Sequence, residues 1–283
     1  MVRLEHRVVV EAVGRPWVDA FVAGVHDAFV DLRFEGGRLV DLADGPVELF
    51  LVEGRHAAPD ARYRLTYPVD PAGSPGERRT LEMVVTAMDR ADETSLAISS
   101  EEEGERLAMK LSLRSVARPH AALVVGTMRW PGRPRSFRRV SWSVQIDVER
   151  WWEQVERQDG RHGDAPVVAE ITHSLAGATI TVVPRPAEEG RWTADIVATV
   201  HGRSWARPLA FVARPFLRGS LLNEYRRVLD EVAEDVNRAV AAFAHEDPDQ
   251  LARDCFTPGA LAHRFQSVRP PDTGDQWPGH HVT

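Results

Sequence analysis

The strongest constraint on the fold of this chain is a strict alternation of apolar and polar residues in its middle and late parts. The alternation is clearest in RLAMKLSLRSV at 106–116, FRRVSWSVQID at 137–147 and RWTADIVATVH at 191–201. Successive side chains of a β-strand point to opposite faces, so a period of two residues predicts half-buried strands. We therefore predict a sheet with one apolar and one solvated face.

Further strands are predicted along the chain, and most segments between them are too short for a crossover helix. Strands that are solvated on one side and joined by short connections form antiparallel sheets, so a parallel α/β fold is disfavoured. These strands are expected in MVRLEHRVVVEAVG (1–14), VELFLVEG (47–54), RYRLTYPV (62–69), TLEMVVTAM (80–88), TSLAISS (94–100), HAALVVGTM (120–128), VVAEITHSL (167–175) and ATITVVP (178–184), with a surface loop at DPAGSPGERR (70–79).

Three segments predict helices instead. Pro16 begins the first, at about 16–30, because proline suits the first position of a helix. DVERWWEQVERQ at 147–158 predicts the second, and its tandem Trp151-Trp152 is expected to divide between core and surface. Within 217–243 apolar residues recur in steps of three and four, which predicts a long helix with one apolar stripe.

The long helix needs a surface to pack against. Its own hydrogen bonds stabilise it little, whereas burial of each large apolar side chain contributes roughly 1.5–3 kcal/mol. Few strands lie between the 147–158 helix and the last one, so the last helix must also use strands from earlier in the chain. We therefore predict one enlarged α+β domain over 1–245. Residues 246–283, rich in Pro, Gly and Asp, are predicted to be a partly irregular C-terminal tail.

The order of these elements resembles a known family. A first strand, a helix, a long antiparallel meander and the closing segment WARPLAFVARPFLRGSLLNEYRRVLDEVAEDVNRAVAAF are similar to the START-like, pollen-allergen-like helix-grip superfamily (SRPBCC), which includes bacterial polyketide cyclases and lipid carriers. The extra strands and the 147–158 helix depart from that pattern. The resemblance implies a curved antiparallel sheet gripping the long C-terminal helix, enlarged or internally duplicated, with a hydrophobic cavity between them.

A cavity of this kind is also expected physically, because a twisted sheet and a cylindrical helix rarely fill all the space between them. Aromatic and methionine side chains on the inner face suit an apolar polycyclic ligand, although ordinary core packing explains the same residues. The expected ligand-binding residues are Met109, Trp142, Trp192, Ile196, Leu221, Val228, Leu229 and Val232.

Two titratable residues are candidates for catalysis. His173 shares its parity with Val167, Ala169 and Ile171, so its imidazole is placed to act as an acid or base on a carbonyl substrate. A hydrogen-bonded histidine at a strand end explains the same residue. Tyr225 lies on the apolar stripe of the last helix, where its hydroxyl needs a partner, either a ligand carbonyl or a backbone carbonyl.

The sequence contains no fingerprint of a nucleotide, metal or hydrolase site, and we predict no cofactor and no metal. Cys255 is the single cysteine, which excludes an internal disulfide and a cysteine metal cluster and suits a cytoplasmic protein. A net charge of −7 argues against nucleic-acid binding. The arginines of RWPGRPRSFRR (129–139) are better explained as a solvated turn than as a nucleic-acid site. No segment is apolar enough to span a membrane.

The leading functional hypothesis is a protein that binds a polyketide-like or polycyclic small molecule and promotes its cyclisation or dehydration without a cofactor. Shape, exclusion of water and one or two polar groups are sufficient for such a reaction. The alternative is a carrier or sensor that holds a lipid or hydrophobic metabolite unchanged. No oligomeric state is predicted.

Overall fold

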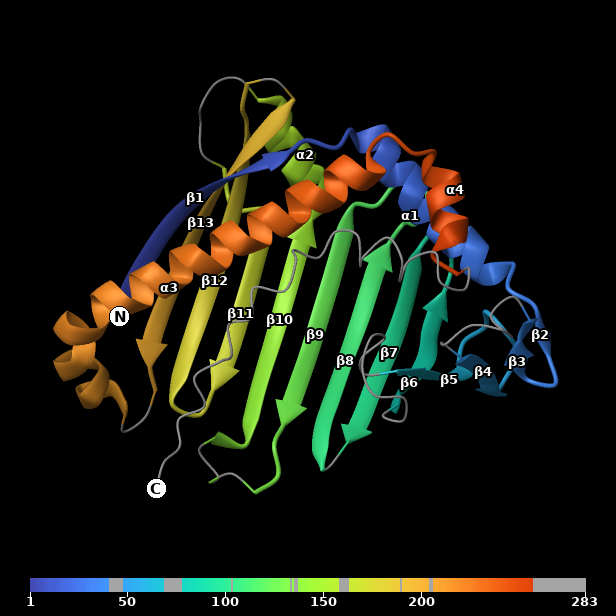
Figure 1. Cartoon of the computed structure of the whole chain (residues 1–283), viewed down its shortest axis with the longest axis horizontal. Helices are drawn as coiled ribbons and strands as arrows, with labels where there is room; N and C mark the ends of the chain where they lie inside the picture. Colours follow the sequence, from blue (N-terminus) through green and yellow to red (C-terminus); the bar gives the residue numbers. More distant parts are fainter. Residues whose placement is uncertain are drawn as a thin grey trace.

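The fold is a single curved antiparallel sheet with helices along its open side (Figure 1). A computed structural model describes residues 1–40, 48–68, 78–102, 104–132, 134, 137–157, 163–188, 190–203 and 206–256, with the backbone alone described at 68, 102 and 206–221. In these residues 13 strands form the sheet in the order β1-β13-β12-β11-β10-β9-β8-β7-β6-β5-β4-β3-β2. All twelve pairings are antiparallel, as the short connections predict.

The strands follow the predicted segments closely. They are β1 (Val2–Glu11), β2 (Phe34–Glu35), β3 (Arg38–Leu39), β4 (Glu48–Glu53), β5 (Arg62–Pro68), β6 (Arg78–Met88), β7 (Glu93–Glu102), β8 (Glu105–Arg114), β9 (Ala121–Arg129), β10 (Arg139–Asp147), β11 (Val167–His173), β12 (Ala176–Pro186) and β13 (Arg191–Gly202). The sequence did not predict β2 and β3, because two-residue strands are too short to show a period. The loop predicted at 70–79 lies mostly outside the described residues.

Four helices accompany the sheet in the described part of the chain: α1 (Arg15–Val30), α2 (Val148–Glu156), α3 (Ala206–Phe243) and α4 (Pro248–Asp254). The first three confirm the predicted helices, and α3 begins earlier than its apolar stripe indicates. α4 lies in the segment predicted as a tail.

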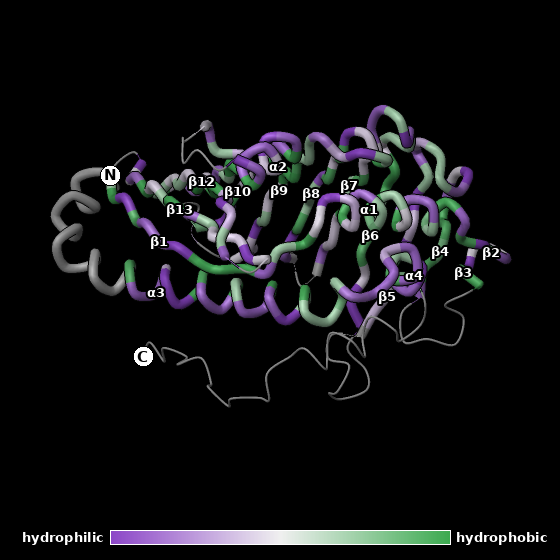
Figure 2. Tube along the Cα trace, turned by 90° about the horizontal axis from the view of Figure 1, so that it is seen from above, coloured by the Kyte–Doolittle hydropathy of each residue, from purple (hydrophilic) through white to green (hydrophobic). Residues whose placement is uncertain are grey.

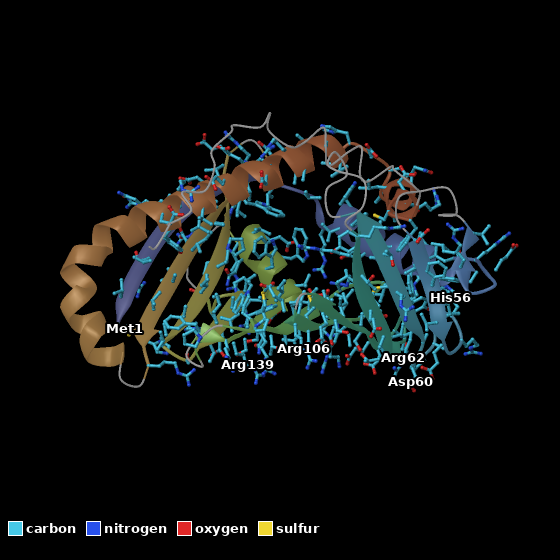
Figure 3. The ribbon with its side chains drawn as sticks, turned by 60° about the horizontal axis from the view of Figure 1, so that its bottom comes forward. Met1, His56, Asp60, Arg62, Arg106 and Arg139 are labelled. Atoms are coloured by element: carbon cyan, nitrogen blue, oxygen red, sulfur yellow. The ribbon has the colours of Figure 1, made fainter. Side chains whose placement is uncertain are left out.

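The connection from β1 to β2 requires the sheet to curve, because these two strands are its opposite edges. Thirteen strands spaced about 4.8 Å apart would span about 58 Å if the sheet were flat. The link holds one 16-residue helix and a few extended residues, and it reaches at most about 50 Å. The edges must therefore approach each other, and Figure 3 shows the sheet bent into a trough with α3 across its open side.

The two faces of the sheet differ in polarity. The inner face carries Val8 on β1 and its direct cross-strand neighbour Ala194 on β13, both buried against α3. Arg62, Arg106 and Arg139 project from the outer face (Figure 3). The cross-strand register continues this division from strand to strand, as the alternation in the sequence predicts.

α3 packs mainly on β1 and β13, the pair of strands at one edge of the sheet. Three polar contacts anchor it there: the Tyr225 hydroxyl donates to the Ile196 carbonyl (3.2 Å), His6 Nε2 lies 2.6 Å from Asp230 Oδ1, and the Asn237 amide bonds the backbone of β1. The apolar stripe and polar face of α3 alternate along the tube in Figure 2. The helix thus contacts two strands at one edge of the sheet, and the grip of the sheet around it stays a prediction.

Asn237 satisfies backbone groups that an edge strand otherwise leaves unpaired. Its Nδ2 donates to the Val9 carbonyl (3.0 Å), and its Oδ1 accepts from the Glu11 N–H (2.7 Å). An uncovered edge of this kind is a template for pairing with another chain, so this contact both positions α3 and blocks the edge at that point.

A second core lies at the other end of the sheet, where Phe29 near the end of α1 packs with buried residues of β4, β5 and β6. Its largest fully buried side chain is Tyr63, beside Phe29 and His56. His56 Nε2 donates to the Phe29 carbonyl (2.9 Å), so Nδ1 is the acceptor for the Tyr63 hydroxyl (2.8 Å). The same hydroxyl accepts the Ala57 N–H (2.9 Å), and the network is satisfied with a neutral imidazole.

α4 docks on α1 and buries Leu251 and Ala252. The helices approach closely at Gly24, where a Cβ would lie 2.8 Å from the Ala252 Cβ. The Trp17 indole also donates to the Glu246 carbonyl (3.1 Å). The start of the predicted tail is therefore part of the packed structure.

Gly24→Ala is expected to destabilise the protein although alanine is the better helix former. Alanine gains about 1 kcal/mol of helix propensity, but overpacking against Ala252 costs about 1–3 kcal/mol. Urea unfolding of the single and double variants measures the balance. Gly24→Ala should cost less in an Ala252→Gly background, and equal costs in both backgrounds would show that the helices do not meet there.

The His56 network predicts acid sensitivity. Burial lowers the pKa of His56 from its ordinary value of 6.5, against the opposing effect of its bonds to the Phe29 and Val30 carbonyls. The unfolded chain therefore binds the proton more readily, so the stability contribution is complete above pH 6.5 and falls as the pH drops below it. The free energy of unfolding should decrease more between pH 7.5 and 5.5 in the wild type than in His56→Gln. Parallel pH profiles would contradict this assignment.

Candidate functional site

An apolar cavity of about 440 Å³ lies on the inner face, where β1, β13, α2 and α3 converge. Val8, Val10, Ala194 and Ile196 form its floor. Ile146 of β10 lies in the same cross-strand row as Ile196, connected through Val167 and Val182. Its volume falls within the range that small-molecule sites usually have.

α2 supplies the aromatic wall of the cavity. Asp147 caps the helix by accepting the Arg150 N–H (2.9 Å), and Glu149 lies in the favourable first turn. Arg15 of α1 binds Glu149 through two hydrogen bonds (2.9 and 2.6 Å), and the bonds from Arg15 lower the pKa of this carboxyl. These contacts fix α2 over the inner face.

Three tryptophans meet at this wall. Trp151 and Trp152 each lie edge-to-face with Trp192, at centroid distances of 5.8 and 5.5 Å. Both members of the tandem therefore line the cavity, and of the two Trp152 is buried whereas Trp151 is half-buried. Large rigid rings at one wall favour a flat or aromatic ligand by area of contact.

α3 forms the opposite wall and leaves part of the cavity accessible. Its lining residues are Leu229, Val232, Ala233, Val236 and Val240. Ala233 is buried, but Val232 is 52% exposed and Val236 is 41% exposed. Apolar side chains that both line a cavity and meet solvent mark its opening.

Four of the eight predicted ligand-binding residues line this cavity: Trp192, Ile196, Leu229 and Val232. Val228 lies on α3 but outside the lining and is 41% exposed. The side chain of Leu221 lies outside the described residues. The structure brings the first four together because the inner parity of β13 meets the apolar stripe of α3.

Met109 and Trp142 lie elsewhere on the inner face. They flank Gly126 in one cross-strand row over β8, β9 and β10. A Cβ on Gly126 would lie 2.3 Å from the Trp142 ring, so the indole lies across the glycine. This row is four residues from that of Ile146, about 13 Å along the strands. The two residues therefore belong to a separate part of the trough.

His173 and Tyr225 are not brought together. His173 ends β11, six residues or about 20 Å from the row that holds Ile196, the residue bonded to Tyr225. Its Nδ1 accepts the Leu175 N–H (3.3 Å), and its ring lies beside Phe137. Tyr225 lies one helical turn from Leu229, and burial raises the pKa of its phenol.

The chemistry available at the cavity is limited. Among the described lining residues, Glu11 is the one ionisable side chain, and it is exposed. Trp152 is buried, and its indole Nε1 has no hydrogen-bond partner in the described part of the chain. An unsatisfied buried donor costs about 1–3 kcal/mol, so an acceptor that reached this nitrogen would bind favourably.

Within the described ranges, no three His, Cys, Asp or Glu side chains are grouped to hold a metal ion. No helix there combines the length and apolarity needed to cross a bilayer.

Comparison with solved structures finds distant neighbours, and two of them come from biosynthetic pathways or loci. The di-domain ARO/CYC protein StfQ from the steffimycin biosynthetic pathway is 12% identical, over 93% of this chain and 99% of its own, with a TM-score of 0.19. DynU16, from the dynemicin biosynthetic locus, is 14% identical, over 90% of this chain and 98% of its own, with a TM-score of 0.21. At these TM-scores neither likeness carries an argument. No protein-family model and no curated protein matches the sequence.

Proposed function

We propose that this protein binds a hydrophobic small molecule in the cavity between α3, α2 and the inner face of the sheet. The observation that carries the proposal is the apolar cavity itself, with its partly exposed valines at the mouth. Burial of apolar ligand surface contributes roughly 25 cal/mol per Å², and this lining offers little else to bind with.

The tryptophan wall and Trp152 Nε1, which has no partner among the described residues, refine the ligand class. The wall suits a ring system, and a carbonyl or ether oxygen on such a ligand is a suitable acceptor for an indole N–H. A polycyclic molecule with a few oxygens, as the sequence hypothesis expects, has both properties.

Val236→Trp is expected to close the mouth of the cavity, because Val236 both lines it and is exposed. The neutral fluorescent probe N-phenyl-1-naphthylamine should brighten saturably with the wild type, and the variant should bind it at least about tenfold more weakly. Val228→Trp is the matched control: Val228 has the same 41% exposure and lies on the same helix, outside the cavity lining. Equal weakening in both variants, or none in either, would contradict this site.

The cavity could belong to a carrier, which leaves the bound molecule unchanged, or to a cyclase, which converts it. The observed lining favours the carrier, because acid–base chemistry there has only Glu11 to draw on among the described residues. Cyclisation remains the second candidate, since Tyr225 lies beside the cavity and shape alone accelerates ring closure. In that case Tyr225, which does not line the cavity, has to release its bond to the Ile196 carbonyl before its hydroxyl can polarise a ligand carbonyl. His173 is about 20 Å away along the strands and is not positioned to move a proton for the same substrate.

Native mass spectrometry of the purified protein distinguishes carrier from cyclase. We expect a bound apolar molecule that is recovered unchanged after incubation, in wild type, His173→Ala and Tyr225→Phe alike. Recovery of a product lighter by one water molecule, lost in Tyr225→Phe, would overturn the carrier assignment and establish the cyclase. Retention of the ligand by Val236→Trp would count against the cavity itself.

A further inference from the structure

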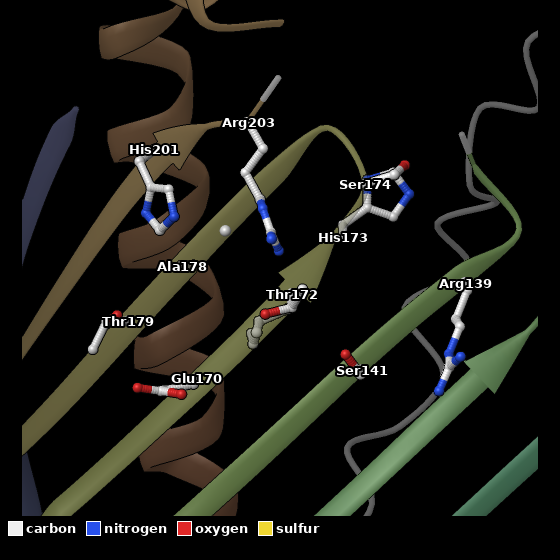
Figure 4. Close-up of a pocket in the computed structure, with 12 residues that line it drawn as sticks. Arg139, Ser141, Glu170, Thr172, His173, Ser174, Ala178, Thr179, His201 and Arg203 are labelled. Atoms are coloured by element: carbon white, nitrogen blue, oxygen red, sulfur yellow. The ribbon is translucent and has the colours of Figure 1, made fainter. Parts of the chain in front are cut away.

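A second hollow, of about 910 Å³, lies on the outer face of the sheet and is separate from the cavity. Figure 4 shows this groove over the ends of β10 to β13, with α3 behind the strands. Its walls carry two arginines, two histidines and several hydroxyl groups. None of these side chains has a part in the function proposed above.

The floor of the groove is one row of directly paired residues. Ser141 of β10 faces Thr172 of β11, Thr172 faces Gly177 of β12, and Gly177 faces His201 of β13. Neighbours in such a row are about 5 Å apart. The missing side chain at Gly177 lets the His201 ring lie over the floor, because a Cβ there would lie 2.5 Å from His201 Nε2.

Two arginines flank the same side of this row. Arg139 lies two residues from Ser141, and Arg203 lies two residues from His201, so the two residues are three strand spacings, about 14 Å, apart on the same side of the row. Figure 4 shows Arg203 reaching toward the end of β11 and Arg139 beside β10. Many arginines of this chain bind carboxylates, as Arg15 and Arg227 do. Arg139 and Arg203 have no ion-pair partner among the described residues, although the chain has a net charge of −7.

One carboxylate lies on the other side of the row. Glu170 is two residues before Thr172 and pairs across the strands with Thr179. It is exposed and makes no ion pair with either arginine in the described structure. The groove is therefore polarised, with cationic side chains at one end and a carboxylate about 13 Å away along the strands.

We propose that this groove binds a small phosphorylated molecule, with its phosphate between Arg139 and Arg203 and a hydroxyl or amino group toward Glu170. Planar guanidinium groups bind phosphate oxygens in pairs, and the hydroxyls of Ser141 and Thr172 and the His201 ring supply further donors. A tetrahedral phosphate presents oxygens to donors on several sides, whereas a carboxylate presents two in one plane. Glu170 repels a second anion and accepts a hydrogen bond from the far end.

Histidine side-chain NMR on the full chain tests the proposal with inorganic phosphate and glycerol 3-phosphate as probes. The Cε1–H signal of His201, assigned by its loss in His201→Gln, should shift saturably with both probes. Glycerol 3-phosphate should bind more tightly, because its hydroxyls face Glu170, and Glu170→Ala should remove that preference. Equal affinity for the two probes in the wild type would overturn the role of Glu170.

The variants separate charge from shape. Arg139→Gln/Arg203→Gln should weaken phosphate binding at least about tenfold, while Arg114→Gln should not. Arg114 is an exposed arginine on the same face, and its side chain has no ion-pair partner among the described residues. Gly177→Ala keeps every charge but displaces the His201 ring, and it should weaken binding as well. Unchanged affinity in the double variant, or equal loss in Arg114→Gln, would overturn the proposal. Val236→Trp should leave phosphate binding intact, because Val236 lines the cavity and not the groove. The two proposals can therefore be refuted independently of each other.

Discussion

The structure depends on one covalent constraint: the chain passes from one edge of a 13-stranded sheet to the other through a single helix and two short linkers. That link is shorter than the flat sheet is wide, so the sheet bends and its two edges approach each other. Bending creates an inner face that must be covered, and α3 covers it at the β1 edge through Tyr225, Asp230 and Asn237. The cavity is the volume that this coverage leaves unfilled.

The alternation of side chains gives the same sheet two different surfaces. On β13, Ile196 faces the apolar cavity, while His201, of opposite parity, faces the outer groove. The two hollows are therefore chemically distinct although they share strands β10 and β13. One is suited to apolar rings, and the other presents two guanidinium groups that make no ion pair with another described residue. The two proposed ligands therefore differ in charge and are proposed for opposite faces.

Two sets of polar contacts stabilise the elements that carry these surfaces. His56 and Tyr63 share one complete network at the far end of the sheet, and Arg15 and Glu149 fix α2 where its tryptophans meet Trp192. Several buried polar atoms lack a hydrogen-bond partner among the described residues, and Trp152 Nε1 is the one that belongs to a residue lining the cavity. At the groove, Arg139 and Arg203 make no ion pair with another described residue. A buried donor without a partner at the wall of a cavity is a position at which a ligand contact is expected.

Much of the fold could be predicted from the sequence, because strand and helix periods are local. The residue pattern predicts the positions of β1, of the ten strands from β4 to β13, and of helices α1, α2 and α3. Alternation alone also places Trp192 and Ile196 on the inner face. Half of the residues that the periodicity predicted for ligand binding line the cavity. Met109 and Trp142 share that parity but lie in another cross-strand row, which parity does not specify.

What the sequence by itself determined is therefore which residues share a face and which segments are strand or helix, since these depend on neighbours along the chain. Only the tertiary structure decided which residues share a cross-strand row and which side chains meet. It brings Trp151 and Trp152 to Trp192, and it places His173 far from Tyr225. It also places Arg139 and Arg203 on the same side of the row that contains Gly177. Those juxtapositions depend on the register between strands and on the curvature imposed by the β1–β2 link, and both arise from contacts between residues distant in the chain.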